Sequence, residues 1–219
     1  MAETKNKTRL DQIALDIEFL LISVIQGVAL AALAAAAVGP FGDLRFEYWL
    51  YIISAFLLIL NFWSQAIIHA ISFIDWPLDL PHSFLYFLAS LIEVMIFSHL
   101  TDPLRWFAFS FVFFIVAAVL YFYDLRLIKE HEKIVKDPIK KRFFAHIIKR
   151  QMFEYKVLLP SALIFNGCAF LLVLFLPSVF LDQQFHIALG AGQAFFALVV
   201  LIDATRNFKT RSRLIEEIQ

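Results

Sequence analysis

Long apolar runs, separated by short polar or proline-containing segments, dominate the hydropathy pattern of this chain. A bilayer core about 30 Å thick needs about 20 apolar residues per crossing helix. The runs do not alternate as barrel strands do, and in hydrocarbon the backbone groups of such a run are satisfied only in a helix. We therefore predict an all-α, polytopic membrane protein with six transmembrane helices, at residues 13–38, 48–74, 83–100, 104–122, 157–176 and 185–202.

Lysine and arginine cluster in three segments, namely the N-terminal tail, residues 126–156 and the C-terminal tail. With six crossings, all three clusters fall on one side of the bilayer, and the positive-inside rule makes that side the cytoplasm. We predict a multi-pass protein of the cell (inner) membrane with both termini cytoplasmic. Its organisation is transmembrane helices in 1–125, a cytoplasmic linker at 126–156, two further transmembrane helices in 157–205 and a cytoplasmic tail at 206–219.

The linker contains an amphipathic helical pattern. Between residues 139 and 152, apolar residues recur at helical spacing opposite basic ones. This pattern is typical of a helix that lies along an anionic membrane surface. The residues expected to bind that surface are Lys140, Lys141, Arg142, Lys149 and Arg150. A solvated cytoplasmic extension that only determines topology is an alternative that the pattern leaves open.

Glu93 lies in the middle of the third apolar run. An ionisable group at that depth costs about 2.5–3.5 kcal/mol on insertion scales, so it normally faces protein or water. Ser83, Tyr86 and Ser90 share its side of the predicted helix. We predict that Glu93 points into the protein beside a polar partner, and that without one it is protonated and donates a hydrogen bond.

A stripe of polar residues follows the second predicted helix. Its members are Ser54, Asn61, Gln65, His69 and Ser72. Their spacing places them on one side of a helix with 3.6 residues per turn. Hydrogen bonding between helices, worth about 0.6 kcal/mol per residue, explains such a stripe, and an ion or proton path explains it equally well. Under both interpretations Asn61, Gln65 and His69 face other helices or water.

The first predicted helix adds Asp16 near its cytoplasmic end and Gln26 near its middle. A carboxylate such as Asp16 also suits the positive N-terminal end of a helix. In the sixth helix, His186 and Gln193 share a face, with His186 expected at the outer interface. The candidate pore or polar intramembrane network comprises Asn61, Gln65, His69, Glu93, Gln26 and Asp16.

Composition excludes several classes of function. Hydrophobic residues make up 61% of the chain and charged residues 17%, with a mean hydropathy of +0.77. The lone Cys168 has no Cys or His at metal-ligand spacing. We find no nucleophile paired with a base and no histidine pairs suited to haem, so we expect no enzyme activity, no catalytic residues, no cofactor and no metal. The lipid bilayer is the expected partner, nucleic acid is not, and the phenylalanine-rich run at 104–122 should face lipid.

Trp63, His69, Phe73 and Asp75 follow one another in the second predicted helix and the loop after it, in an order that resembles that of a known family, whereas Arg9 and Asp16 stand where the sequence departs from that family's helix 1 motif. In this order and in its six-helix topology, the chain resembles the bacterial endolysosomal-type potassium channel family, whose subunits assemble around a pore lined by helix 1. The family's Phe-Ser-Asp on helix 1 is Ala14-Leu15-Asp16 here. The resemblance implies a homo-oligomeric channel, or an ion-conducting subunit, selective for monovalent cations. The alternative is a non-catalytic accessory or scaffold subunit of a larger membrane complex.

Overall fold

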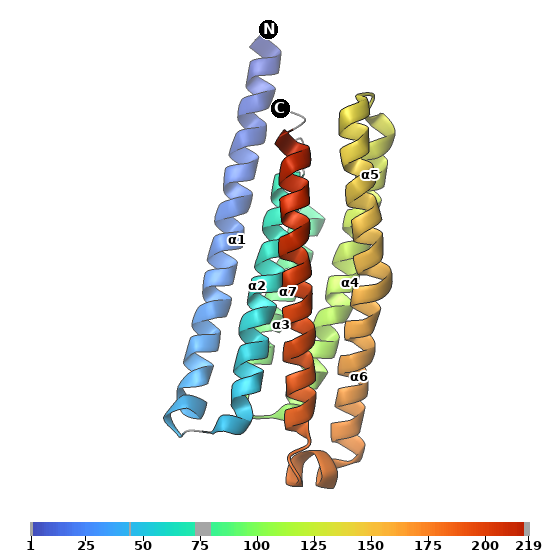
Figure 1. The fold of residues 1–219 in the computed structure, drawn as a ribbon. Helices are drawn as coiled ribbons and strands as arrows, with labels where there is room; N and C mark the ends of the chain where they lie inside the picture. Colours follow the sequence, from blue (N-terminus) through green and yellow to red (C-terminus); the bar gives the residue numbers. More distant parts are fainter. Residues whose placement is uncertain (1, 44, 73–79, 217–219) are drawn as a thin grey trace.

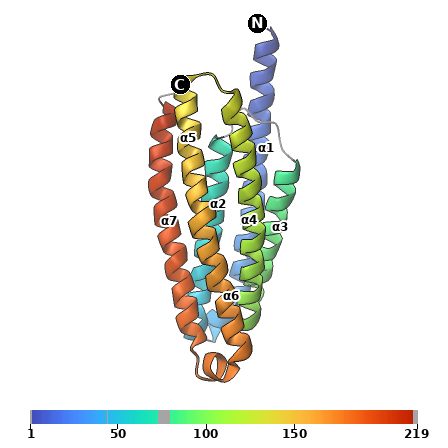
Figure 2. The same ribbon diagram turned by 90° about the vertical axis from the view of Figure 1, so that its right-hand side faces the viewer.

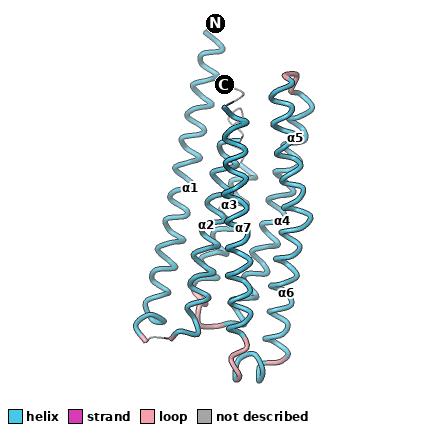
Figure 3. The backbone as a smooth tube through the Cα atoms, viewed as in Figure 1, coloured by secondary structure: helices cyan, strands magenta, loops and turns pink. Residues whose placement is uncertain are grey.

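The computed structural model describes residues 2–43, 45–72 and 80–216, and in these ranges it contains helices and no strand. The α-helices are α1 (Ala2–Gly42), α2 (Trp49–Ser72), α3 (Leu80–Phe97), α4 (Pro103–Ile134), α5 (Pro138–Phe153), α6 (Leu159–Phe175) and α7 (His186–Glu216). A short 3-10 turn, η1 (Phe46–Tyr48), and two π-helical turns, η2 (Glu154–Leu158) and η3 (Ser178–Asp182), complete the described elements. Figure 3 shows short loops between several of the described helices. The predicted all-α fold is confirmed.

Helix length and composition identify the membrane-crossing candidates. Among the described residues, five helical segments are long and apolar enough to cross a bilayer: Phe19–Gly42, Phe46–Ile67, Pro103–Ile134, Lys141–Phe175 and His186–Thr210. The apolar part of α3, Pro81–Phe97, is shorter. Five predicted spans therefore have the dimensions of a crossing helix, which is compatible with a multi-pass membrane protein. The crossing predicted at 83–100 stays a prediction.

The helices run side by side along one common direction (Figures 1 and 2). α2 packs against α1 and α7, whereas α4 packs against α3 and α6. The start of α1, the end of α7 and the turn between α4 and α5 lie at the same end of the bundle (Figure 1). The three basic clusters therefore share one end, and we refer to it as the basic end.

The location of the linker helix along a membrane surface stays a prediction, and the structure places this helix, α5, in contact with α4. The predicted helix exists, but it continues through η2 into α6 as one rod (Figures 1 and 2). Phe143 and Ile147 on the apolar face of α5 bury against Ile128 on the extension of α4, whereas Ile139 is exposed. The segment is therefore half of a helical hairpin that extends the bundle.

The π turn η2 results from the proline at position 160. Pro160, near the start of α6, has no N–H to bond the carbonyl group of Lys156, and its ring would collide with that carbonyl in a regular α-helix. A π turn immediately before the proline relieves this conflict by adding one residue to the turn.

The added residue keeps one face of the α5–α6 rod buried. The buried positions are Phe143, Ile147, Gln151, Glu154, Leu159, Ala162, Asn166, Ala169 and Val173. Successive members are three or four residues apart, except for the step of five from Glu154 to Leu159, which falls in η2. The buried residues of α5 and those of α6 therefore both face the core.

α4 packs between α3 and α6, and the expectation that its aromatic side chains face lipid is wrong for Trp106, Phe107 and Phe113. Trp106, Phe107 and Phe113 are at most 3% exposed. Because α4 contacts both α3 and α6, two of its sides are enclosed by protein. Its rings therefore fill the core, whereas Phe122 near its basic end is exposed.

We predict that Lys141 and Lys209 are accessible from one side of the membrane and Asp182 from the other. Lys141 and Lys209 are exposed near the basic end, whereas Asp182 lies in the exposed turn η3 at the opposite end. Single cysteines would be placed at these positions in a Cys168→Ser background and treated with a membrane-impermeant thiol reagent in sealed vesicles. Labelling of positions 141 and 209 from opposite sides would contradict the arrangement.

Candidate functional site

A buried hydrogen-bond network around Gln193 joins α7 to α4 and α6. Trp106 Nε1 donates to Gln193 Oε1 at 2.6 Å, and Gln193 Nε2 donates to Asn166 Oδ1 at 2.9 Å. Gln193 Nε2 also lies 3.4 Å from Ser110 Oγ, to which it donates. All four side chains are buried. Because the amide of Gln193 is satisfied on both its oxygen and its nitrogen, the network holds the three helices together.

A second set of bonds joins α2 to α7 along the predicted polar stripe. Ser54 Oγ donates to Gly190 O at 3.3 Å, and Asn61 Nδ2 donates to Ala197 O at 2.9 Å. The Tyr51 hydroxyl group lies 3.0 Å from His186 Nδ1 and 3.1 Å from His186 O. Ser54 and Asn61 of the stripe thus face α7, and His186 is buried among protein side chains.

Gly190 lies where α7 meets α2, at a position where a Cβ atom would make ordinary van der Waals contact. A Cβ atom at Gly190 would stand 3.4 Å from the ring of Tyr51. The side chain of His69, which sequence analysis placed in the same stripe, lies outside the described residues.

Glu93 is fully buried where α3 faces α1. Gln26 is its polar neighbour, and Gln26 Nε2 donates to Tyr86 Oη at 3.3 Å. Both carboxyl oxygens of Glu93 and Oε1 of Gln26 lack a hydrogen-bond donor in the part of the chain that the structure describes. A neutral carboxylic acid would supply one donor to Gln26, whereas a charged carboxylate would leave all three acceptors unpaired at a cost of several kcal/mol.

A partly open cavity of about 170 Å³ lies between the helices, and all seven described α-helices, α1 to α7, together with η2, contribute to its wall. Its aromatic lining comprises Phe62, Tyr86, Phe87, Phe113, Phe114, Tyr121 and Phe196. Its polar lining comprises Asn61, Gln65, His82, Ser83, Asp124, Gln151 and Glu154. Of the predicted site residues, Asn61 and Gln65 therefore face the cavity. Gln26 and Glu93 are absent from its described lining.

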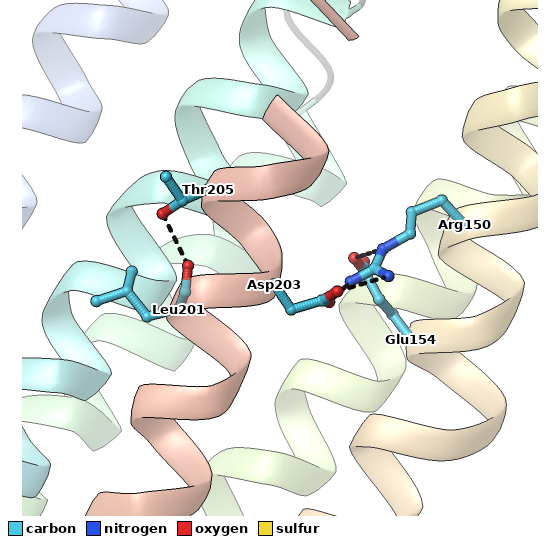
Figure 4. Close-up of polar contacts among 5 residues, drawn as sticks. All are labelled: Arg150, Glu154, Leu201, Asp203 and Thr205. Atoms are coloured by element: carbon cyan, nitrogen blue, oxygen red, sulfur yellow. Dashed lines mark hydrogen bonds and ion pairs between the residues drawn. The ribbon is translucent and has the colours of Figure 1, made fainter. Parts of the chain in front are cut away.

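Acidic groups gather where the cavity approaches the basic end. His82 Nε2 lies 3.4 Å from Asp124 Oδ1. Arg150 Nε donates to Glu154 Oε1 at 2.8 Å, and the same guanidinium group pairs with both carboxylate oxygens of Asp203 on α7 (Figure 4). Arg150 thus joins the α5–α6 rod to α7 through Asp203 and pairs with Glu154 within the rod.

Arg150 therefore departs from the expectation that it binds the membrane surface, because its guanidinium group is turned inward to Glu154 and Asp203. Lys141, Arg142 and Lys149 are exposed and available to a membrane or to solvent.

The remaining predicted site residues fall elsewhere. Asp16 is exposed on α1, away from the cavity lining, and the side chain of Lys140 lies outside the described residues.

Sequence reasoning missed Asp124, Glu154 and Asn166. A signal for Asp124 was present, because Leu120 and Ile128 lie four residues to either side and are buried with it. Continuing the helical period of α4 beyond Phe122 would have placed Asp124 inside. Glu154 has no comparable signal, because the π turn breaks the period directly after it.

Comparisons of the chain with protein-family models, with curated proteins and with solved structures found no match.

We predict that Gln193→Leu destabilises the protein. The substitution leaves the Trp106 N–H and the Asn166 carbonyl group buried without these partners, at about 1–3 kcal/mol for each unsatisfied group. Unfolding in detergent by heat or denaturant would measure the loss. Phe195→Leu is the matched control on the same helix, because Phe195 is 69% exposed. Equal destabilisation by the two substitutions would contradict a central role for the network.

We predict that Arg150→Met lowers the free energy of unfolding on the order of 3 kcal/mol, because it leaves the buried carboxylate of Glu154 without its counter-charge. Adding Glu154→Gln to Arg150→Met should restore most of that loss. Lys149→Met, at the exposed neighbouring position, is the control. A double variant as unstable as Arg150→Met alone would show that the pair is not the cause.

Proposed function

We propose that this chain is a cation-conducting subunit of the cell (inner) membrane, with six spans and cytoplasmic termini. The proposal takes α3 as the sixth span. α3 packs along α4 and α1, and an even number of crossings is needed to put the basic N-terminal tail, the α4–α5 hairpin and the C-terminal tail on one side. The positive-inside rule supports the cytoplasm as that side.

The observation that carries the proposal is the charge of the central cavity. The carboxylates of Asp124 and Glu154 line the cavity, with His82 beside Asp124, and outside the lining Arg150 pairs with both Glu154 and Asp203. Among these described groups, three carboxylates face one arginine and one histidine, which leaves a net negative charge in either state of His82. The described lining contains no lysine or arginine. In surroundings of low dielectric constant such a charge attracts cations and repels anions.

The positions of the cavity and of the Gln193 network along α7 support an ion path that is closed beyond the cavity. The cavity reaches Phe196 and Val200 on α7, whereas Gln193 lies one turn closer to the opposite end. There Trp106, Gln193 and Asn166 are buried, and Gln193 is hydrogen-bonded to the other two. We propose that the cavity is a cytoplasmic vestibule and that the Gln193 network is the barrier beyond it.

We propose homo-oligomeric assembly as part of this function, as the potassium channel resemblance implies. The small residues Gly27, Ala31 and Ala35 lie on an exposed side of α1. A Cβ atom added at Gly27 would meet no atom of the described structure within 4 Å. Small residues allow close approach between helices in a membrane. In this proposal the copies associate around α1, while each chain contains its own cavity.

We predict that the purified protein in liposomes supports potassium flux and little chloride flux. Asp124→Asn should reduce the cation flux about tenfold, because it removes a charge that concentrates cations in the cavity. Glu130→Gln is the matched control, since Glu130 lies on the same helix and is exposed. Flux would be followed with a potassium-sensitive dye inside the vesicles.

Absence of potassium flux in correctly folded protein would contradict conduction and favour the accessory or scaffold subunit. Equal potassium and chloride flux would contradict the charge argument.

A further inference from the structure

We propose that the central cavity binds an organic cation whose ammonium nitrogen carries alkyl groups. The inference rests on the proposed function in one respect, since it names the ligand class of the same cation-attracting cavity. Three properties of the cavity carry it: an aromatic wall, a largely apolar interior and a negatively charged end.

The aromatic wall is built by three rings from three helices. Phe62 of α2 stacks on Tyr86 of α3, with ring centroids 4.7 Å apart, and meets Phe113 of α4 edge to face at 5.7 Å. All three residues line the cavity, and Phe114 beside Phe113 also lines it. Aromatic rings attract ammonium groups through the negative potential of their faces, most strongly where water is excluded.

The interior of the cavity suits an alkylated cation better than a bare metal ion. Alkali and alkaline-earth ions need several oxygen ligands to replace their water. Much of the wall is instead carbon, with Ile22, Ile25 and Leu58 beside the aromatic rings. An ammonium group that carries alkyl substituents presents an apolar surface to such a wall, and its positive charge is spread beneath that surface.

The polar end of the cavity discriminates by charge. The carboxylates of Asp124 and Glu154 line it, and no lysine or arginine does among the described residues. The carboxylate or phosphate of an anionic amphiphile would be repelled there. Asn61 also lines the cavity, and its Oδ1 is buried without a hydrogen-bond donor in the described part of the chain. A ligand that carries a donor group near the ammonium nitrogen would satisfy it.

The test uses choline as the probe and the full chain in nanodiscs of phosphatidylethanolamine and phosphatidylglycerol, which contain no competing choline headgroup. Isothermal titration calorimetry would compare choline with its uncharged analogue in which carbon replaces the nitrogen. We expect saturable binding of choline and at least about tenfold weaker binding of the analogue, which has the same shape without the charge. Equal binding of the two, or binding of neither, would overturn the inference.

Two substitutions locate the site, each with a control. Phe62→Leu and Asp124→Asn should weaken choline binding about tenfold each, because they remove an aromatic ring and a carboxylate from the wall. Phe84→Leu and Glu130→Gln remove an exposed ring and an exposed carboxylate outside the cavity and should leave binding unchanged. Loss of binding in the controls, or unchanged binding in both cavity variants, would place the ligand elsewhere and overturn the inference.

The binding measurement separates this inference from the proposed function. Charge-selective choline binding at the cavity supports the ligand class even if liposomes show no potassium flux, a result that would contradict conduction alone. Potassium flux without choline binding would overturn the ligand class and leave conduction standing.

Discussion

Lipid offers no hydrogen bonds, and this constraint governs how the bundle is built. Polar side chains within a spanning segment therefore depend on partners inside the protein, and among the described residues most hydrogen bonds between helices involve α7. Gln193 binds α4 and α6 from one side of α7, while Ser54 and Asn61 on α2 bind its backbone from the other. α7 is therefore held between two groups of helices, and the cavity lies within the frame that these bonds make rigid.

Hydropathy predicted the helices and the polar stripe on α2 because both follow from the cost of placing polar groups in hydrocarbon. Glu93 could likewise be expected inside, and it is fully buried. The acidic end of the cavity could not be found in this way. Glu154 lies in a segment whose charges look solvated along the chain, and only contacts between helices show that Arg150 pairs inward with it and with Asp203. A basic run does not reveal which of its members turns toward the core.

The position of α4 explains why aromatic residues and charges meet in one cavity. A helix enclosed on two sides can bury large rings along most of its length, and the rings of Trp106 and Phe113 on α4 are buried in this way. The same face carries Asp124 toward the basic end, where His82 of α3 and the α5–α6 rod approach it. The cavity wall thus changes from carbon to carboxylate along a single helix, and a molecule with an apolar body and a positive charge matches both parts.

The π turn at Glu154–Leu158 affects how this chain can be compared with others. It contains one residue more than a regular helix needs to keep α5 and α6 in phase, and an α-helix rotates by about 100° for each residue. A relative that lacks Pro160 has no need of the extra residue and can form a plain α-helix there. An alignment of the two sequences must then open a gap of one residue inside a continuous helix, a place where gaps are normally penalised. Without that gap, every inward residue of α5 would be matched to a residue on the wrong face.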